Sequence, residues 1–375
     1  MAGYIFTLNN EDSLHEMIVN GFYSTYLNIN TDHWKAHHEG TFADYLSMSE
    51  GDHVYFFIKR KIFGIGKLRN VGFDCKYLNF PGADSPEAPK YKDVKSSMLI
   101  DGSSRNLNNR VLCTFSGNPA FFKHGIDMDE VLMSNPEAFK MLRVLWKRSF
   151  IKIDDKEDAA LFDVILKTNE GALGIASATF TESPKLHNRI SRLVGGSYEM
   201  SAGNILDLAS MGGRTKHEMA IEAGVIEYIK KNPSGIFGNW GYLSHQVVAS
   251  PFKPVDYMDK MDIFGYRRIS PYNTISKYLV IELKKGIADK EVIHQVMKYV
   301  DWVNQEYAYK DYSMIEAFVV ASDFPTEVVA LKEEVGTRIF AKGSRPVKTE
   351  KWAKLRFIKY RFNPTSKQLE FTEVH

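Results

Sequence analysis

The sequence predicts a mixed α/β (α+β) fold with two domains. The chain has 375 residues, and at roughly 150 residues per domain this length favours two domains. Its second half alternates helical and strand-like hydrophobic patterns, which is typical of helices packed on a mixed sheet. With 44% hydrophobic and 25% charged residues, the composition is that of an ordinary globular protein and excludes a disordered or fibrous chain.

Residues 1–165 form the first expected domain, in which short strands and helices alternate. The expected elements are a strand at Tyr4–Leu8, a helix with Asn10 near its N-terminal cap, a β-hairpin within Gly51–Leu68, and helices at Pro136–Trp146 and Ala159–Leu166. The hairpin follows a Gly-Asp turn signal, and two glycines in its return strand allow a bulge or a close backbone approach.

Residues 166–204 form the expected linker, because glycine and small polar residues are frequent there. A short helix is expected within it at Leu186–Leu193.

Residues 205–375 form the second expected domain. The order is helix, three strands, helix, strand, helix and two strands, at Lys216–Lys231, Tyr242–Val248, Met261–Tyr266, Tyr278–Leu283, Asp289–Val303, Ile315–Ala321, Thr326–Val335, Leu355–Phe362 and Leu369–Thr372. This order predicts an α/β sandwich around a mixed sheet.

The cysteine spacing and the hydropathy pattern argue against several classes of protein. Cys75 and Cys113 lie far apart without a CxxC spacing, which argues against a zinc site or a disulfide framework. The start lacks a signal-peptide pattern, and no apolar run approaches the roughly 20 residues that span a bilayer. We therefore expect a cytoplasmic protein without a membrane partner. The net charge of +2 does not by itself indicate nucleic acid.

An acid and a lysine end the apolar strand at Tyr278–Leu283. Glu282 and Lys284 are two residues apart and therefore share one face of the strand. Burying both charges is unfavourable unless they have partners, and a divalent metal and a phosphate would be such partners. A bare ExK is more often a solvated surface ion pair, so neighbouring residues must decide between these interpretations.

Two neighbouring features favour the metal site. Asp262 precedes an apolar strand and, facing Glu282, would give two oxygen ligands for Mg²⁺; Asp259 is its competitor. Gln295 and Tyr299 are four residues apart on the helix that follows the ExK strand, so they share one helix face. Taken singly, each of these residues is also compatible with a turn, a polar flank or a core position.

Together, Asp262, Glu282-Leu283-Lys284 and Gln295-x-x-x-Tyr299 resemble the motifs of the PD-(D/E)xK nuclease superfamily, in particular its NucS-like and RecB-like branches. The resemblance covers about residues 205–375 and implies a restriction-endonuclease-like α/β sandwich. The interval from Asp262 to Glu282 is longer than a tight hairpin, which we interpret as a loop insertion near residues 271–277. The superfamily's additional helix acid is assigned to Glu222, with Glu218 as the rival.

The resemblance implies hydrolysis of phosphodiester bonds with Mg²⁺, for which Mn²⁺ would substitute. Asp262, Glu282 and the Leu283 carbonyl would hold the metal. Lys284 would orient the attacking water and stabilise negative charge, and Gln295 and Tyr299 would position the lysine or the nucleic-acid backbone.

The hairpin GDHVYFFIKRKIFGIGKL resembles the core of PUA-like domains, including the EVE group. This resemblance implies a β-barrel that reads a modified or flipped base over roughly residues 1–165. Trp34 is the first candidate for an aromatic base pocket, followed by Tyr23 and Tyr55. Ordinary core packing is the alternative for each.

The C-terminal stretch is basic and contains interleaved aromatic residues. Its cations are Lys342, Arg345, Lys348, Lys351, Lys354, Arg356, Lys359, Arg361 and Lys367, with aromatics Trp352, Phe357 and Tyr360 among them. The pattern fits contacts to a polyanion, and solvated strand faces are an equally weighted alternative.

The interpretation that combines both domains is a modification-dependent restriction endonuclease that acts on DNA in antiviral defence, as a homodimer that cuts both strands. A NucS-like repair nuclease for mismatched or branched DNA and a catalytically silent nucleic-acid-binding protein are the alternatives. RNA stays open as a substrate.

Overall fold

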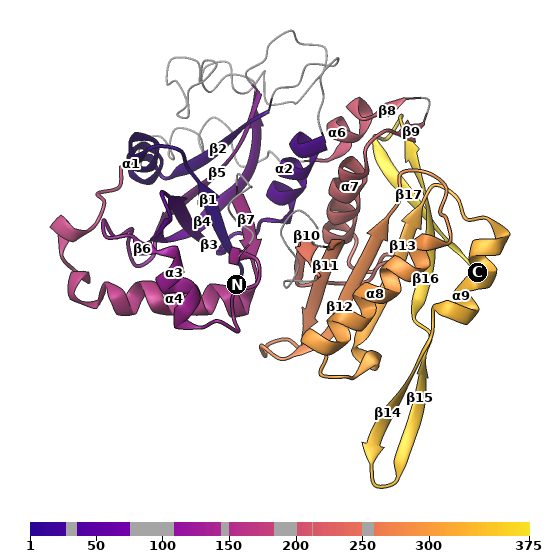
Figure 1. Cartoon of the computed structure of the whole chain (residues 1–375). Helices are drawn as coiled ribbons and strands as arrows, with labels where there is room; N and C mark the ends of the chain where they lie inside the picture. Colours follow the sequence, from indigo (N-terminus) through magenta and orange to yellow (C-terminus); the bar gives the residue numbers. More distant parts are fainter. Residues whose placement is uncertain (28–35, 76–108, 144–149, 184–200, 212, 250–258) are drawn as a thin grey trace. The chain divides into compact units, whose positions relative to one another are not determined.

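The computed structural model describes residues 1–27, 36–75, 109–143, 150–183, 201–211, 213–249 and 259–375 (Figure 1). The chain divides into two compact units, Met1–Ser201 and Ala202–His375. Both units combine helices with mixed sheets, so the predicted mixed α+β class is confirmed. In the described ranges, no helix is both long enough and apolar enough to cross a membrane.

The first unit is built on a seven-stranded sheet. Its strands are β1 (Gly3–Thr7), β2 (Phe22–Leu27), β3 (His53–Ile58), β4 (Lys61–Cys75), β5 (Asn109–Gly117), β6 (Ile126–Asp127) and β7 (Phe150–Ile153). Its helices are α1 (Glu11–Asn20), α2 (Ala36–Ser47), α3 (Met128–Ser134) and α4 (Asp155–Thr168). The expected hairpin corresponds to β3 and β4, and Asn10 caps α1 by accepting a hydrogen bond from the Ser13 N–H.

The first sheet is open where the sequence interpretation expected a barrel. Its main order is β2-β5-β4-β3-β1-β7, with β6 on β4, and β1 and β3 run parallel while their neighbours pair antiparallel. A barrel requires its two edge strands to pair. Within the described ranges β2 pairs only with β5 and β7 only with β1, so the expected closed barrel is not formed there.

The helix expected at Pro136–Trp146 is wrong over its described part. Residues 136–141 form turns and bends, residues 142–143 are in a 3-10 conformation, and a helix that was not expected, α3, precedes them. The buried Glu157 carboxylate accepts the backbone N–H groups of Met141 at 2.8 Å and Leu142 at 3.2 Å. A side chain from α4 thus satisfies backbone donors that a helix would have bonded internally.

Part of the expected linker is bonded to the first unit. The N–H of Phe180 donates to the Phe121 carbonyl at 2.8 Å, and the N–H of Ser183 donates to the Val19 carbonyl at 2.6 Å. The short helix expected at Leu186–Leu193 lies outside the described residues.

The second unit contains a six-stranded sheet in the order β10-β11-β12-β13-β16-β17. The strands of this unit are β8 (Ser210–Met211), β9 (Arg214–Thr215), β10 (Tyr242–Val248), β11 (Lys260–Arg268), β12 (Ile275–Leu283), β13 (Ile315–Ala321), β14 (Arg338–Ser344), β15 (Val347–Trp352), β16 (Leu355–Asn363) and β17 (Gln368–Val374). Its α-helices are α6 (Gly203–Leu208), α7 (Glu218–Lys231), α8 (Glu291–Glu306) and α9 (Thr326–Val335).

The second sheet is mixed and carries helices on both faces. β12, β13 and β16 run parallel, and the outer pairs are antiparallel. On one face, Tyr228 of α7 meets Phe371 of β17; on the other, Lys332 of α9 lies over the ring of Phe357. The predicted α/β sandwich around a mixed sheet is therefore confirmed.

Helix α8, which the sequence predicted at Asp289–Val303, carries a stripe of valines on one face. Val292, Val296, Val300 and Val303 are buried, and the helix packs along β12 and β13. Because residues at i and i+3 or i+4 share a helix face, this packing also turns Gln295 towards the end of β12.

A long hairpin, β14 and β15, was not expected from the sequence. Its two strands pair only with each other among the described residues, and the hairpin extends beyond the main sheet (Figure 1). Most of its side chains are exposed, so the chain there lacks the alternating hydrophobic pattern that reveals a strand.

Gly265 in the middle of β11 provides a test of how closely β10 and β11 pack. A Cβ at this position would meet the Tyr242 carbonyl oxygen at 2.6 Å. We expect Gly265→Ala to lower the free energy of unfolding by about 1–3 kcal/mol, because backbone must shift to admit the methyl group. Urea denaturation followed by circular dichroism measures the change.

Gly241→Ala is the matched control, because a Cβ there meets nothing within 4 Å. It should change stability by no more than about 0.5 kcal/mol. Equal stabilities of the two variants would contradict the close packing.

Candidate active site

Two carboxylates meet on one face of the second sheet. Ile263 of β11 pairs with Ile281 of β12, so the antiparallel register places Asp262 opposite Glu282. Residues directly opposite on neighbouring strands point to the same face. The hydrophobic neighbours Ile263, Ile281 and Leu283 are buried, which fixes the register and thereby the position of both acids.

Glu282 is 1% exposed. One of its oxygens, Oε1, accepts a hydrogen bond from Lys284 Nζ at 3.0 Å. The other, Oε2, is buried and has no hydrogen-bond donor among the described residues while the neighbouring acids are ionised. Burial raises the pKa of Glu282 to about 7, although Lys284 opposes this shift.

Asp262 holds its carboxylate between two strands. Oδ2 accepts the Leu283 N–H at 2.8 Å, and Oδ1 accepts from Gln246 Nε2 at 3.1 Å. Burial, followed by the charges of Glu282 and Glu222, raises the pKa of Asp262 well above its usual value. A cation beside Asp262 would offset the effect of these neighbouring charges.

Lys284 places one positive charge beside the two acids. Burial by itself would lower its pKa, but Glu282 and the surrounding acids raise it above its usual value, so the ammonium stays protonated. Its Nζ also donates to Gln295 Oε1 at 3.3 Å. Gln295 Nε2 in turn donates to the Tyr299 hydroxyl at 3.1 Å. The ammonium is thus held between β12 and α8.

Glu222 reaches the same cluster from α7. It is 1% exposed, with Oε1 accepting from Gln246 Nε2 at 2.8 Å and Oε2 lying 2.9 Å from His245 Nδ1. Gln246 therefore bridges Glu222 and Asp262. Its φ of 52° lies in the left-handed region, which costs energy for a residue other than glycine and is most common at functional sites.

The two rival acids occupy different positions. Glu218, in the first turn of α7, accepts the Lys285 N–H at 3.2 Å and borders the cluster. Asp259 pairs with Lys298 of α8 at 2.6 Å. Neither is joined to Asp262 by a hydrogen bond in the described structure.

Sequence reasoning did not identify His245 and Gln246. A signal was present, since Ser244, His245 and Gln246 interrupt the apolar residues of the strand at Tyr242–Val248. Polar residues inside a buried strand require partners, but the partner of each is a side chain on another element.

The donor set fits Mg²⁺. Among the described residues no three His, Cys, Asp or Glu side chains gather closely enough to hold a metal by themselves, because Glu222 is turned towards His245 and Gln246. Mg²⁺ commonly takes one or two carboxylates and keeps several waters. Asp262 and Glu282, with the buried Oε2 facing no donor, meet that requirement, and the Leu283 carbonyl is adjacent in the chain.

Two of the three residues expected to form a base pocket lie in the core of the first unit. Tyr23 is 4% exposed and stacks on Phe6 with ring centroids 3.9 Å apart. Tyr55 is fully buried and its hydroxyl donates to Asp158 at 2.9 Å. Both rings lie in the core of the first unit because they sit on inward-facing strand positions, and Trp34 lies outside the described residues.

The basic C-terminal stretch separates into paired and exposed cations. Ion pairs join Lys342 to Glu350, Arg356 to Glu373, Lys359 to Asp323 and Lys367 to Asp207. The interleaved aromatics Trp352, Phe357 and Tyr360 are buried, so they are core residues and do not offer stacking faces. Their alternation with charged residues reflects strand periodicity.

Comparisons with known proteins are sparse. No family model and no curated protein matches the chain. Among solved structures, a repair endonuclease from Pyrococcus abyssi aligns at 22% identity with a TM-score of 0.23, covering 34% of this chain and 47% of that one. A complex of EndoMS with double-stranded DNA aligns at 22% identity and a TM-score of 0.23, covering 37% and 45%. The chain thus matches less than half the length of these proteins, and similarity at this level does not transfer an activity.

Asp262→Asn tests the cluster of carboxylates without an activity assay. Because the pKa values of both acids are raised, stability that is present at low pH is lost as the pH rises, in the case of Glu282 through about 7. At about pH 8 and without metal, we expect the variant to be more stable than the wild type by ~1 kcal/mol, or about 2–4 °C in melting temperature. Adding Mg²⁺ should raise the melting temperature of the wild type and leave that of the variant unchanged.

Asp259→Asn is the matched control, because it removes a nearby carboxylate that pairs with Lys298. It should retain the wild-type response to Mg²⁺. The same response in Asp262→Asn would show that the ion binds elsewhere.

Proposed function

We propose that the chain is a Mg²⁺-dependent nuclease that hydrolyses phosphodiester bonds of DNA. The observation that carries this proposal is the meeting of Asp262, Glu282 and Lys284 on one face of β11 and β12, with a Glu282 oxygen that has no donor among the described residues. Paired carboxylates beside a charged lysine are suited to a divalent cation and a phosphate.

Asp262, Glu282 and the Leu283 carbonyl would hold the ion. When bound, Mg²⁺ would polarise the phosphate and offset the charge that develops during hydrolysis. The protein's own contribution begins with rigidity: Asp262 is held by the Leu283 N–H and by Gln246, so its orientation does not depend on the substrate. Such preorganisation is the main means by which an active site stabilises a transition state.

Lys284 would direct its ammonium towards the phosphate and the attacking water. The hydrogen bonds to Glu282 and Gln295 hold its Nζ in place. Tyr299 is buried and bonded to Gln295, so it would act through Gln295 as a positioning residue. Glu222 would keep Gln246 aligned on Asp262.

A polyanionic substrate is supported by exposed cations near the end of the chain. Arg345, Lys348 and Lys351 are exposed on the β14–β15 hairpin and have no acid partner within the described ranges. Lys and Arg at such positions neutralise backbone phosphates without reading sequence.

The finer proposal is a modification-dependent restriction enzyme of antiviral defence, in which the first unit recognises a modified base. It rests on the PUA-like sequence pattern at Gly51–Leu68. A homodimer would bring two catalytic centres to the two strands of a duplex. Repair of mismatched or branched DNA is the competing use of the same catalytic centre.

Lys284→Met tests the catalytic proposal. The change keeps a long side chain but removes the charge, so kcat should fall about 10²–10³-fold. Cleavage of plasmid and phage DNA with Mg²⁺ measures it, and EDTA should abolish wild-type cleavage. Lys290→Met, which removes an exposed lysine paired with Glu327 on the same unit, should cut as the wild type does. A wild type that binds DNA but never cuts it would leave only a binding function.

A panel of DNA substrates tests the finer proposal. We expect cleavage of cytosine-modified phage DNA and little cleavage of the same DNA without modification. Preferential cutting of mismatched or branched duplexes, regardless of modification, would replace restriction with repair.

A further inference from the structure

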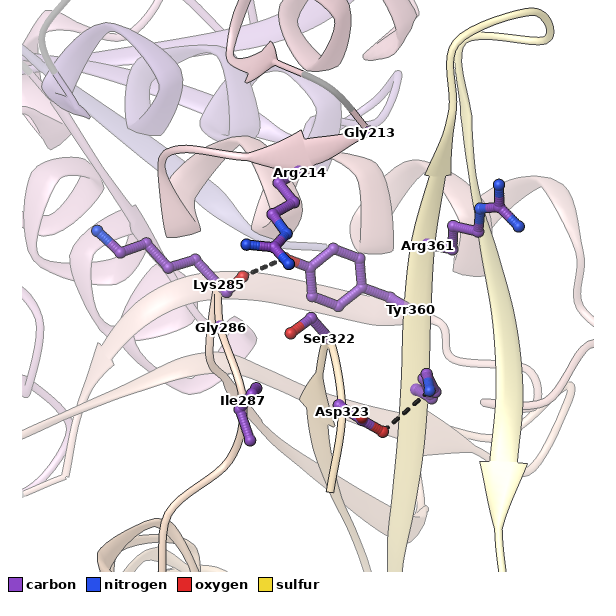
Figure 2. A pocket seen from close by; sticks show the side chains of 10 residues that line it. Gly213, Arg214, Lys285, Gly286, Ile287, Ser322, Asp323, Tyr360 and Arg361 are labelled. Atoms are coloured by element: carbon purple, nitrogen blue, oxygen red, sulfur yellow. Dashed lines mark hydrogen bonds and ion pairs between the residues drawn. The ribbon is translucent and has the colours of Figure 1, made fainter. Parts of the chain in front are cut away.

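A pocket of about 580 Å³ opens beside the candidate active site (Figure 2). Its walls are Lys285–Ile287 after β12, Ser322 and Asp323 after β13, residues 359–361 of β16, and Gly213 and Arg214 at β9. The pocket therefore lies at the carboxyl ends of two parallel strands, where sheets of this kind commonly bind ligands. Its volume is in the range of ligand-binding pockets.

The lining is positively charged. Lys359 is neutralised by Asp323 at 2.9 Å, whereas Arg214, Lys285 and Arg361 have no ion pair in the part of the chain that the structure describes. Figure 2 shows the Arg214 guanidinium next to the hydroxyl end of Tyr360, with the Lys285 and Arg361 side chains extending to either side. Arg214 is the cation that lies beside Tyr360 in the hollow, and Lys285 and Arg361 add positive charge at its rim, which favours an anion.

The walls are fixed before any ligand arrives. The Tyr360 hydroxyl donates to the Lys285 carbonyl at 2.6 Å (Figure 2). The Ser322 N–H donates to the Gly286 carbonyl at 2.9 Å, and the Ala288 N–H donates to the Asp323 carbonyl at 2.9 Å. A preformed site loses little conformational entropy on binding.

The lining of the pocket begins one residue after Lys284 of the candidate active site. Lys285 directly follows Lys284, and its N–H donates to Glu218 of α7 at 3.2 Å. Glu218 is close enough to act electrostatically on Glu282 and Lys284 on one side and on Tyr360 on the other. A strand whose phosphate reaches Lys284 would therefore place an adjoining nucleotide at this pocket.

We propose that this pocket binds a nucleotide of the substrate strand next to the phosphodiester that is hydrolysed, with its phosphate bound by Arg214 and with Lys285 and Arg361 adding positive charge at the rim. The inference rests on the proposed nuclease function. Ile287, which is 66% exposed at the pocket, offers an apolar contact to the sugar or base. Such phosphate contacts position a strand without reading its sequence, so the pocket fixes which bond faces Lys284.

Two variants test the pocket. Arg214→Gln removes an unpaired cation, and Gly286→Asp adds a carboxylate where a Cβ meets nothing within 4 Å. We expect each to weaken DNA binding about 10-fold, measured by fluorescence anisotropy with Ca²⁺ in place of Mg²⁺. Arg214→Gln should also reduce the slope of log K against log salt by about 1. In cleavage assays KM should rise more than kcat falls, because the contact is made before and during reaction.

Gly241→Asp is the matched control. A Cβ there also meets nothing within 4 Å, and Gly241 precedes β10 at the opposite end of the sheet from the pocket. It should bind and cut DNA as the wild type does, and thermal melts of all variants confirm folding. If the wild type cuts DNA but Arg214→Gln and Gly286→Asp bind DNA with the wild-type affinity and salt slope, the pocket proposal is overturned. The nuclease proposal then stays intact.

A second measurement separates a strand nucleotide from a free one. If a deoxynucleoside monophosphate raises the melting temperature of the wild type but not of Gly286→Asp, and both bind DNA equally, the pocket takes a free nucleotide and the strand proposal is overturned. If the wild type binds DNA without cutting it, only catalysis fails, and the binding comparison still decides the pocket. If the wild type neither binds nor cuts DNA, both proposals fall.

Discussion

The arrangement of the second unit depends on two buried carboxylates on neighbouring strands. Asp262 and Glu282 lie opposite one another, and burial raises the pKa of both carboxyl groups. A protein under selection for stability alone would replace such a pair by apolar side chains. Here the acids are surrounded by Lys284, Gln246 and the Leu283 N–H, and one oxygen of Glu282 has no donor in the part of the chain that the structure describes. That uncompensated charge is what a divalent cation would satisfy.

The surrounding helices hold this cluster from opposite sides. α7 supplies Glu222, which fixes Gln246, and α8 supplies Gln295, which fixes Lys284. Gln246 has a left-handed backbone conformation. This conformation costs conformational energy, and such strained residues are most common at functional sites. The adjoining pocket begins one residue after Lys284, so substrate positioning and chemistry would share a single strand end.

Elements with strong periodicity were predictable. The valine stripe of α8 and the apolar strands β12 and β13 appear where the sequence placed them, because each buries a continuous hydrophobic face. The helix expected over residues 136–143 does not form. Glu157, which lies farther along the chain on α4, accepts the N–H groups of Met141 and Leu142, and a local sequence pattern does not reveal this contact. Tyr23, Tyr55 and the aromatics of β16 are residue types that can stack on bases, but all of them are buried in the protein core. Their burial depends on tertiary packing, which the local sequence does not reveal.

The sequence by itself determined the mixed α/β sandwich of the second unit and the candidate residues Asp262, Glu282, Lys284, Gln295 and Tyr299, because strand and helix periods place them on defined faces. Only the tertiary structure decided that Asp262 lies opposite Glu282, that His245 and Gln246 join Glu222, and that Arg214 meets residues of β16 at one pocket. The physical reason is that register between strands and the packing of helices depend on contacts between residues far apart in the chain, which no local period encodes.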